Sequence, residues 1–140
     1  MSHQPPLIYI AEDDADDRFL LRQAFAAIPG CRAVLFASSE QFYRHMIAIE
    51  APEALPALIV LDFNMPLING GELLLRLKRE ERLQAIPVVL YSTGMLPILE
   101  ETLRSYGAHA CFLKSLSYPE MEAMAANLSR MARGFQHLAV

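Results

Sequence analysis

One uninterrupted apolar run near the middle of the chain constrains the fold more than any other feature. Leu58 to Leu61 is apolar at every position and ends abruptly in Asp62 and a turn that contains Pro66. A run without alternation is typical of a strand buried on both faces in the middle of a parallel sheet. Ligands bind beyond the carboxyl ends of such strands, so the carboxylate of Asp62 is a candidate reacting group. The simpler alternative is an aspartate that only caps a turn.

Other short apolar segments share the character of this strand and alternate with stretches of helical periodicity. Strands are predicted at residues 7–11, 33–37, 58–61, 87–91 and 110–113. Each is followed by apolar residues at helical spacing; in the first helix these are Phe19, Leu20, Leu21, Ala24, Phe25 and Ile28. Later helices begin with a capping-box spacing, at Ser38 to Gln41, Asn69 to Glu72 and Ser117 to Glu120. Pro97 is expected to interrupt the fourth helix near its start.

This alternation of strands and helices indicates an α/β fold. Crossovers between parallel strands are right-handed and place helices on both faces of the sheet. We therefore predict a five-stranded parallel sheet, doubly wound in the flavodoxin-like manner with strand order 2-1-3-4-5. The 140 residues form a single domain. Its core is expected at about residues 7–133, with a short C-terminal tail at 134–140.

The charge distribution excludes several classes of partner. With a net charge of −4 and scattered Lys and Arg residues, the chain offers no basic surface for nucleic acid or an anionic membrane. No apolar stretch approaches the roughly eighteen residues of a membrane span, and residues 1–6 lack the features of a signal peptide. We expect a soluble, cytoplasmic protein. Cys31 and Cys111 have no metal-binding spacing and are expected to be small buried residues in strands.

Chemically active side chains follow the ends of the predicted strands. Glu12 and Asp13 follow the first strand, Asp62 the third, Ser92 the fourth and Lys114 the fifth. The carboxyl ends of parallel strands meet at one edge of a sheet, so these side chains are expected to converge. In the order 2-1-3-4-5 the first and third strands are neighbours, which places the acid pair and Asp62 beside the same crevice.

Such a cluster suits a divalent cation and phosphoryl chemistry. Each pair of carboxylates about 4 Å apart costs about 4 kcal/mol at an effective dielectric constant of about 20. Mg²⁺, which prefers oxygen ligands, would offset this repulsion among Glu12, Asp13 and Asp62. A carboxylate oxygen of Asp62 can also attack phosphorus to form an aspartyl phosphate. A lysine at Lys114 and a hydroxyl at Ser92 are the groups that stabilise phosphoryl oxygens.

Each of these residues also has an ordinary structural explanation. Asp14, Asp16 and Asp17 lie in the first turn of a predicted helix, where acidic residues interact favourably with the helix dipole. Ser92 alone is typical of a turn, and Lys114 alone is typical of a solvated surface. The functional interpretation rests on their combination, in the order of strands that one site requires.

These motifs together resemble the receiver domain of two-component response regulators, over the chain from Leu7 to about Arg133. The resemblance lies in the Glu12-Asp13 pair, in Asp62 with Asn64-Met65-Pro66 and Gly70, and in Ser92 and Lys114. It implies that Asp62 accepts a phosphoryl group from the phosphohistidine of a sensor histidine kinase. It also implies Mg²⁺ bound by Asp13, Asp62, the backbone carbonyl of Asn64 and, through water, Glu12.

The resemblance further implies a signalling output and a class of partner. Ser92 and Lys114 would engage the phosphoryl oxygens and alter the face made by the fourth helix, fifth strand and fifth helix. Receivers without an output domain resemble chemotaxis regulators and the partners of bacterial phytochromes, and the acidic opening of this chain is closer to the latter. A homodimer is a second candidate assembly. Apolar tail residues suit it, although chain ends often carry such residues without function: Phe135, Leu138 and Val140.

Three positions depart from the pattern of the family or bear on its chemistry. Cys111 stands where receivers usually have Tyr or Phe, which puts aromatic gating in doubt. Ser115 stands where a proline, often after a cis peptide bond, usually follows the lysine; a cis bond at Lys114-Ser115 would cost about 3 kcal/mol or more. Gly94 has no side chain to place over a phosphoryl group, so water access there is expected to depend mainly on Asn64.

Three functions therefore compete. The first is a single-domain phosphoryl acceptor that is not an enzyme for an external substrate and that loses its phosphoryl group slowly. The second is a binding module of the same fold that works without phosphorylation, to which Cys111 and Ser115 point. The third is an Mg²⁺-dependent phosphatase, which lacks an additional acid placed to assist a leaving group.

Overall fold

A computed structural model describes residues 4–114 and 117–138 of the chain, with side chains up to residue 136. The strands are β1 (Leu7–Ala11), β2 (Arg32–Phe36), β3 (Leu58–Asp62), β4 (Val88–Ser92) and β5 (Ala110–Leu113). The helices are α1 (Ala15–Ala26), α2 (Ser39–Ala48), the short 3-10 helix η1 (Pro52–Ala54), α3 (Gly70–Arg79), α4 (Pro97–Ser105) and α5 (Tyr118–Leu138).

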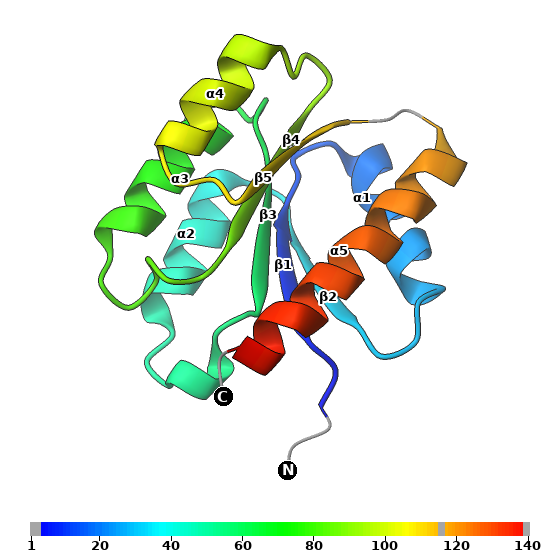
Figure 1. Ribbon diagram of the computed structural model, residues 1–140, viewed down its shortest axis with the longest axis horizontal. Helices are drawn as coiled ribbons and strands as arrows, with labels where there is room; N and C mark the ends of the chain where they lie inside the picture. The colour runs from blue at the N-terminus through cyan, green and yellow to red at the C-terminus, as the bar shows by residue number, and fades with distance from the viewer. Residues whose placement is uncertain (1–3, 115–116, 139–140) are drawn as a thin grey trace.

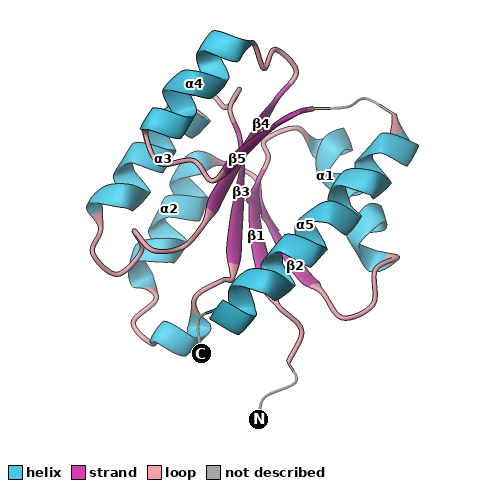
Figure 2. Cartoon of the chain, in the orientation of Figure 1, coloured by secondary structure: helices cyan, strands magenta, loops and turns pink. Residues whose placement is uncertain are grey.

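The strands form one sheet in the order β2-β1-β3-β4-β5, and every neighbouring pair is parallel. Helices α1 and α5 cover one face of the sheet, and α2, α3 and α4 cover the other (Figures 1 and 2). The predicted fold class and strand order are therefore confirmed. The central strands β1 and β3 lie side by side, with Ile10 opposite Val60 and Ala11 opposite Leu61.

The uninterrupted apolar run is explained by two separate cores, one on each face of the sheet. Along β3, Leu58 and Val60 pack with α1 and α5, whereas Ile59 and Leu61 pack with α2, α3 and α4. All four side chains are fully buried or nearly so. A strand with one solvent-exposed face alternates polar and apolar residues, whereas β3 is buried on both faces and is apolar from Leu58 to Leu61. This burial also fixes Asp62 at the end of a rigid strand.

Side-chain caps begin four of the described helices, and at the start of α5 Ser117 Oγ accepts from the Glu120 N–H (3.3 Å), as predicted. Ser38 Oγ accepts from the Gln41 N–H (3.1 Å), and Asn69 Oδ1 accepts from the Glu72 N–H (2.9 Å), as the capping-box spacings predict. Asp14 Oδ1 accepts from the Asp17 N–H (2.9 Å) and so caps α1. Asp14 thus stabilises a helix start, which agrees with its ordinary structural explanation.

Several local predictions were wrong. Phe19 is 57% exposed, because it lies on the side of α1 away from the core. Strands β2 and β4 are each displaced by one residue from prediction. Cys31 precedes β2 instead of lying in a strand, and Cys31 and Cys111 are only partly buried. Pro97 does not interrupt α4 but begins it, at a position where the missing N–H costs nothing.

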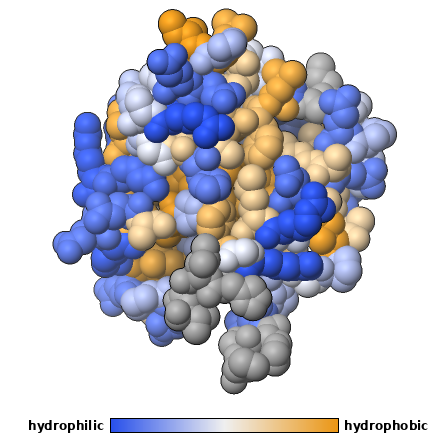
Figure 3. Space-filling view, in the orientation of Figure 1, coloured by the Kyte–Doolittle hydropathy of each residue, from blue (hydrophilic) through white to orange (hydrophobic). Residues whose placement is uncertain are grey.

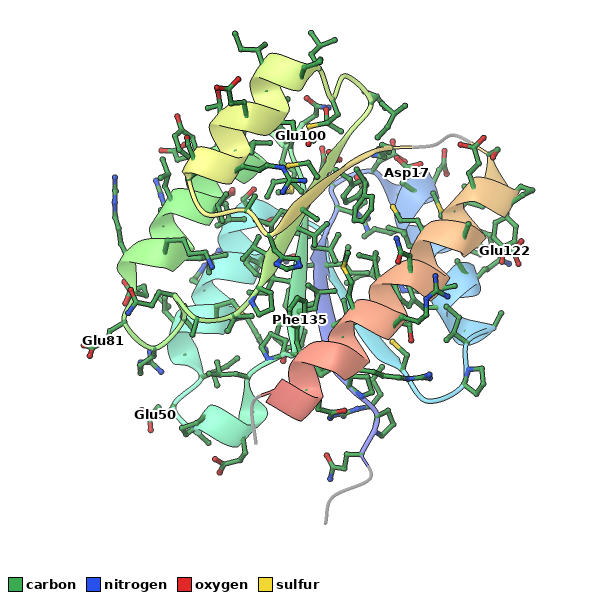
Figure 4. All side chains as sticks on the ribbon, viewed as in Figure 1. Asp17, Glu50, Glu81, Glu100, Glu122 and Phe135 are labelled. Carbon is green, nitrogen blue, oxygen red and sulfur yellow. The ribbon has the colours of Figure 1, made fainter. Side chains whose placement is uncertain are left out.

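The predicted tail is largely helical. Helix α5 continues through Gly134 to Leu138, so residues 134–138 form its end. Phe135, labelled in Figure 4, packs edge-on against His109, with ring centroids 4.8 Å apart, which ties this part of the helix to the residue just before β5. The side chain of Leu138, the whole of Val140, and the bond between Lys114 and Ser115 lie outside the described residues.

Within residues 4–114 and 117–138, no helix is both long enough and apolar enough to cross a membrane. The exposed apolar residues include Leu96 and Ile98 at the beginning of α4, where apolar atoms gather at the top of the molecule in Figure 3. Leu113, the last residue of β5, is also exposed.

Candidate functional site

The acidic and basic candidates converge at the carboxyl edge of the sheet. Glu12 follows β1, Asp62 ends β3, Ser92 ends β4 and Lys114 follows β5. Parallel alignment of the strands brings these ends together although they are far apart in sequence (Figure 1). The convergence that the strand order predicts is therefore observed.

Asp62 is a buried carboxylate between a backbone donor and a lysine. It is 2% exposed. Its Oδ1 accepts from the Asn64 N–H (3.0 Å), and its Oδ2 lies 3.2 Å from Lys114 Nζ. Burial, followed by the negative charge of Glu12, raises the pKa of Asp62 to about 6. Ionising the Asp62 carboxyl therefore costs more free energy in the folded protein than in water.

Glu12 is fully buried, and both of its carboxylate oxygens have donors. Oε1 accepts from Lys114 Nζ (2.8 Å) and from the Tyr91 hydroxyl (2.5 Å), and Oε2 accepts from the Asp14 N–H (3.0 Å). The guanidinium of Arg18 also donates to the Glu12 carbonyl (2.9 Å). A buried carboxylate needs such donors, and here they fix its orientation.

Lys114 connects three carboxylates. Its Nζ lies 2.8 Å from Glu12 Oε1, 3.2 Å from Asp62 Oδ2 and 2.8 Å from Asp17 Oδ2, and its side chain is 8% exposed. Burial alone would lower the pKa of Lys114, but the hydrogen bonds to Asp17 and Glu12 and the nearby negative charges raise it. Lys114 is therefore a permanent cation at this site.

Two contributors to the site were not identified from the sequence. The sequence explains Asp17 by the helix dipole, yet its carboxylate also binds Lys114 from the first turn of α1, beside the carboxyl end of β5 (Figure 4). The sequence places Tyr91 in a strand and indicates no role for its side chain. Burial raises its pKa well above the ordinary value, so its hydroxyl stays protonated and donates to Glu12. The acidic cluster was the only sequence signal for either.

The donor set at this edge fits a hard divalent cation. Glu12, Asp13 and Asp62 each present a carboxylate oxygen, and the three oxygens lie within 4.8 Å of one another. Asp13 is more exposed than the other two. Oxygen donors with several negative charges are the ligands that Mg²⁺ prefers. The structure thus brings together the predicted carboxylate ligands, while the role of the Asn64 carbonyl stays a prediction.

Ser92 and Asn64 are linked across the site. Asn64 Nδ2 donates to Ser92 Oγ (2.9 Å), and the Gly94 N–H donates to the same oxygen (3.2 Å). Tyr91 is paired with Asp62 in the register of β3 and β4, so Ser92 comes one residue beyond that pair at the carboxyl edge. The hydroxyl of Ser92 is thus held at the carboxyl edge by the loops after β3 and β4.

The two loops differ in the space around their glycines. A Cβ at Gly70 would lie 2.7 Å from the Asp62 carbonyl oxygen, so a side chain there would displace the backbone. A Cβ at Gly94 would meet nothing within 4 Å. Cys111, on β5, packs at the margin of the core that α2, α3 and α4 cover. The β3 loop is therefore closely packed, and the β4 loop is open.

The fold and the acidic edge define a class of signalling domain, and comparison with known proteins agrees. A family model described as the response regulator receiver domain matches residues 8–126. The chain belongs to this family. It is 26% identical over 125 residues to the probable methanogenesis regulatory protein FilR2 of Methanothrix harundinacea (strain 6Ac), an alignment that covers 86% of this chain and 79% of that protein.

Solved structures with the same fold include regulators of light responses and of chemotaxis. The phosphorylated cyanobacterial phytochrome response regulator RcpA matches with a TM-score of 0.78 at 22% identity, covering 89% of this chain and 91% of that chain. The response regulator RPA3017, in red light signaling of R. palustris, matches with a TM-score of 0.76 at 22% identity, covering 88% of this chain and 90% of that chain. The chemotaxis response regulator CheY4 of Vibrio cholerae matches with a TM-score of 0.73 at 15% identity, covering 89% of this chain and 98% of that chain.

Proposed function

We propose that this receiver domain is a phosphoryl acceptor. Asp62 takes a phosphoryl group from the phosphohistidine of a sensor histidine kinase in an Mg²⁺-dependent reaction. The observation that carries the proposal is the buried Asp62 carboxylate in contact with Lys114, beside a second buried carboxylate, Glu12. A structural turn cap has no need of a buried lysine or of two further carboxylates.

In the proposed transfer, a carboxylate oxygen of Asp62 forms a bond to phosphorus while the bond from phosphorus to the histidine nitrogen breaks. The electron pair of that bond returns to the imidazole. Asp62 must be ionised to attack, and its pKa of about 6 leaves it mostly ionised at neutral pH. Mg²⁺, when bound by Glu12, Asp13 and Asp62 with the Asn64 carbonyl, supplies positive charge that offsets the charge of the phosphoryl oxygens.

Lys114 and Ser92 act on the product. Lys114 Nζ is already 3.2 Å from an Asp62 oxygen, so its charge is in place to pair with a phosphoryl oxygen on Asp62. The Ser92 hydroxyl, now bonded to Asn64, is the group that would turn toward that oxygen. Both residues adjoin elements of the α4-β5-α5 face, and we propose that their rearrangement alters this face for a partner. The domain is then a signalling protein and not an enzyme for an external substrate.

The partner classes are part of the proposal. A phytochrome-type kinase is supported by the resemblance in fold to RcpA, described as a phytochrome response regulator, and to RPA3017, described in red light signaling. A homodimer and a cytoplasmic location also remain predictions from the sequence. Sedimentation of the unphosphorylated and phosphorylated protein tests the dimer.

The alternative is a receiver-like binding module that works without phosphorylation. The observation that favours it is Cys111, which lies in β5 at the position where receivers usually have Tyr or Phe. Phosphorylation separates the two proposals, because the binding module need not accept a phosphoryl group at all.

The experiment is a labelling assay with Mg²⁺ and either a histidine kinase or a small acyl phosphate. We expect stable label on the wild-type protein and none on Asp62→Asn. Asp16→Asn is the matched control, since Asp16 is an exposed acid in the same acidic segment. Label that persists on Asp62→Asn, or that is absent from the wild-type protein, contradicts the proposal.

A further inference from the structure

Tyr91 is built into the acidic site through its main chain. In the register of the sheet it is paired with Asp62, and its carbonyl accepts from the Phe63 N–H (2.9 Å). It lies in β4, between β3 and β5, and is 1% exposed. The backbone of Tyr91 is therefore fixed relative to the backbone of the acceptor residue.

The side chain of Tyr91 reaches a different carboxylate. Its hydroxyl donates to Glu12 Oε1 at 2.5 Å, across 79 residues of sequence. The ring packs in the core beneath α1 and α5, and the Lys114 ammonium lies 5.3 Å from the ring centroid. Tyr91 thus touches the acid that follows β1 and the lysine that follows β5, from a strand that lies between β3 and β5.

Glu12 has two side-chain donors, and they differ in how many partners they serve. Lys114 is shared by Glu12, Asp62 and Asp17. The Tyr91 hydroxyl, within the part of the chain that the structure describes, donates to Glu12 alone. Any shift of Lys114 toward another carboxylate leaves the tyrosine as the side chain that still holds Glu12 Oε1.

We propose that Tyr91 is a positioning residue of the divalent-cation site, because its hydroxyl holds Glu12 in the orientation in which the carboxylates of Glu12, Asp13 and Asp62 share one cation. This inference deepens the proposed function and rests on it. Outer residues that bind a metal-ligating side chain commonly change metal affinity by about 10- to 100-fold when they are removed. Tyr91 is not a ligand itself and acts through Glu12.

The competing explanation is that Tyr91 only fills the core. Its ring lies among apolar residues of α1 and α5, and a phenylalanine would fill the same volume. Tyr91→Phe therefore removes the hydroxyl and keeps the ring. The chain offers a matched control in Tyr9, which is also buried in a central strand and whose hydroxyl bonds to His45 (3.2 Å) instead of to an acid.

The experiment is calorimetric titration of the unphosphorylated protein with Mg²⁺ alone. We expect Tyr91→Phe to weaken Mg²⁺ binding about tenfold and Tyr9→Phe to leave it unchanged. In a Glu12→Ala background, Tyr91→Phe should cause no further loss, since the residue through which it acts is gone. Unchanged affinity in Tyr91→Phe, or an equal loss in the Glu12→Ala background, overturns the proposal.

A second measurement needs no substitution and covers the case in which Tyr91→Phe does not fold. Mg²⁺ titration of the wild-type protein, followed by NMR of the tyrosine rings, should shift the Tyr91 signal in step with the calorimetric curve. The Tyr9 signal should stay in place. A stationary Tyr91 signal, or a wild-type protein that binds no Mg²⁺, overturns the proposal. No phosphodonor is present, so failure of phosphotransfer alone leaves these readouts intact.

Discussion

Lys114 Nζ and Asp17 Oδ2 lie 2.8 Å apart and join the end of β5 to the first turn of α1. The same ammonium group also binds Glu12 and Asp62. Asp17 therefore competes with the two buried carboxylates for the same ammonium group. The helix start and the candidate site are coupled through this one ion pair.

The first prediction concerns Asp17. Asp17→Asn removes one of the three carboxylates that bind Lys114. The lysine then binds Glu12 and Asp62 more strongly and competes more effectively with Mg²⁺ for them. We expect Mg²⁺ affinity to fall about threefold, which is about 0.7 kcal/mol and within the range of partly exposed ion pairs. Titration calorimetry measures it. Asp16→Asn removes the same charge from the same turn, and an equal loss in both variants would show that net charge alone is responsible.

The second prediction concerns the cost of ionising Asp62. Its pKa is about 6 in the folded protein against 3.8 for the ordinary group. Between those values the folded state holds a proton that the unfolded state has lost, so the free energy of unfolding falls as pH rises through this range. Asp62→Asn removes the cost. At pH about 7.5 it should be more stable than the wild type by about 3 kcal/mol, because the shift of the Asp62 pKa from 3.8 to about 6 is worth about 1.4 kcal/mol per unit.

This stabilisation should disappear near pH 4, where the Asp62 carboxyl is protonated in the folded state. Urea unfolding at several pH values measures it, with Asp16→Asn as the control. A constant difference between Asp62→Asn and the wild type at all pH values would mean that burial does not disfavour the charged form.

The third prediction concerns the cation site as a whole. A cation that binds only the folded state raises the free energy of unfolding, by about 2.7 kcal/mol at a hundredfold excess over its Kd. Mg²⁺ should therefore raise the Tm of the wild-type protein. Asp13→Asn removes the more exposed carboxylate of the cluster and should lose most of that increase. If Mg²⁺ does not change the Tm of the wild-type protein, the predicted cation site is wrong.

The fourth prediction compares two glycines. Gly70→Ala would place a Cβ 2.7 Å from the Asp62 carbonyl oxygen and 2.9 Å from Phe63 Cα, and backbone atoms cannot move aside cheaply. We expect a loss of about 2 kcal/mol or more in the free energy of unfolding. Gly94→Ala, which meets no atom within 4 Å, should change it by less than about 0.5 kcal/mol. Equal losses would contradict the packing difference.

The fifth prediction concerns the lifetime of the phosphorylated form. Gly94 leaves open space after Ser92, so water access is expected to depend mainly on Asn64. Gly94→Glu places a long charged side chain there and should change the rate of dephosphorylation several-fold, with Gly94→Ala close to wild type. Release of inorganic phosphate from the labelled protein measures it. Identical dephosphorylation rates for Gly94→Glu and the wild type would show that the loop after β4 does not control hydrolysis of the phosphorylated form.

Topology made most of the site predictable. Glu12, Asp62 and Lys114 adjoin strand ends, and once the strand order is known their meeting follows from the geometry of a parallel sheet. The contacts of Asp17 and Tyr91 do not follow in this way. They depend on which way a side chain turns from its helix or strand, and each residue already had a sufficient local explanation, as a helix-start acid or a buried aromatic.

The local errors have the same origin. Phe19 fits a helical repeat, but the repeat does not say how far the apolar face extends around α1. Gly134 is a plausible end for a helix, but α5 continues because its inner residues stay packed on the sheet up to Ala132 and Phe135. Tertiary packing determines the structure at both positions, and the spacing of apolar residues in one sequence does not reveal that packing.

At Gly70, the first residue of α3, a Cβ would lie 2.7 Å from the Asp62 carbonyl oxygen, so α3 approaches the end of β3 as closely as a glycine allows. No such restraint exists at Gly94. The loop after β3 is therefore tightly packed where it meets α3, and the loop after β4 has free space at its glycine. A change of shape at this edge of the sheet therefore meets less steric resistance after β4, on the side of α4, than after β3.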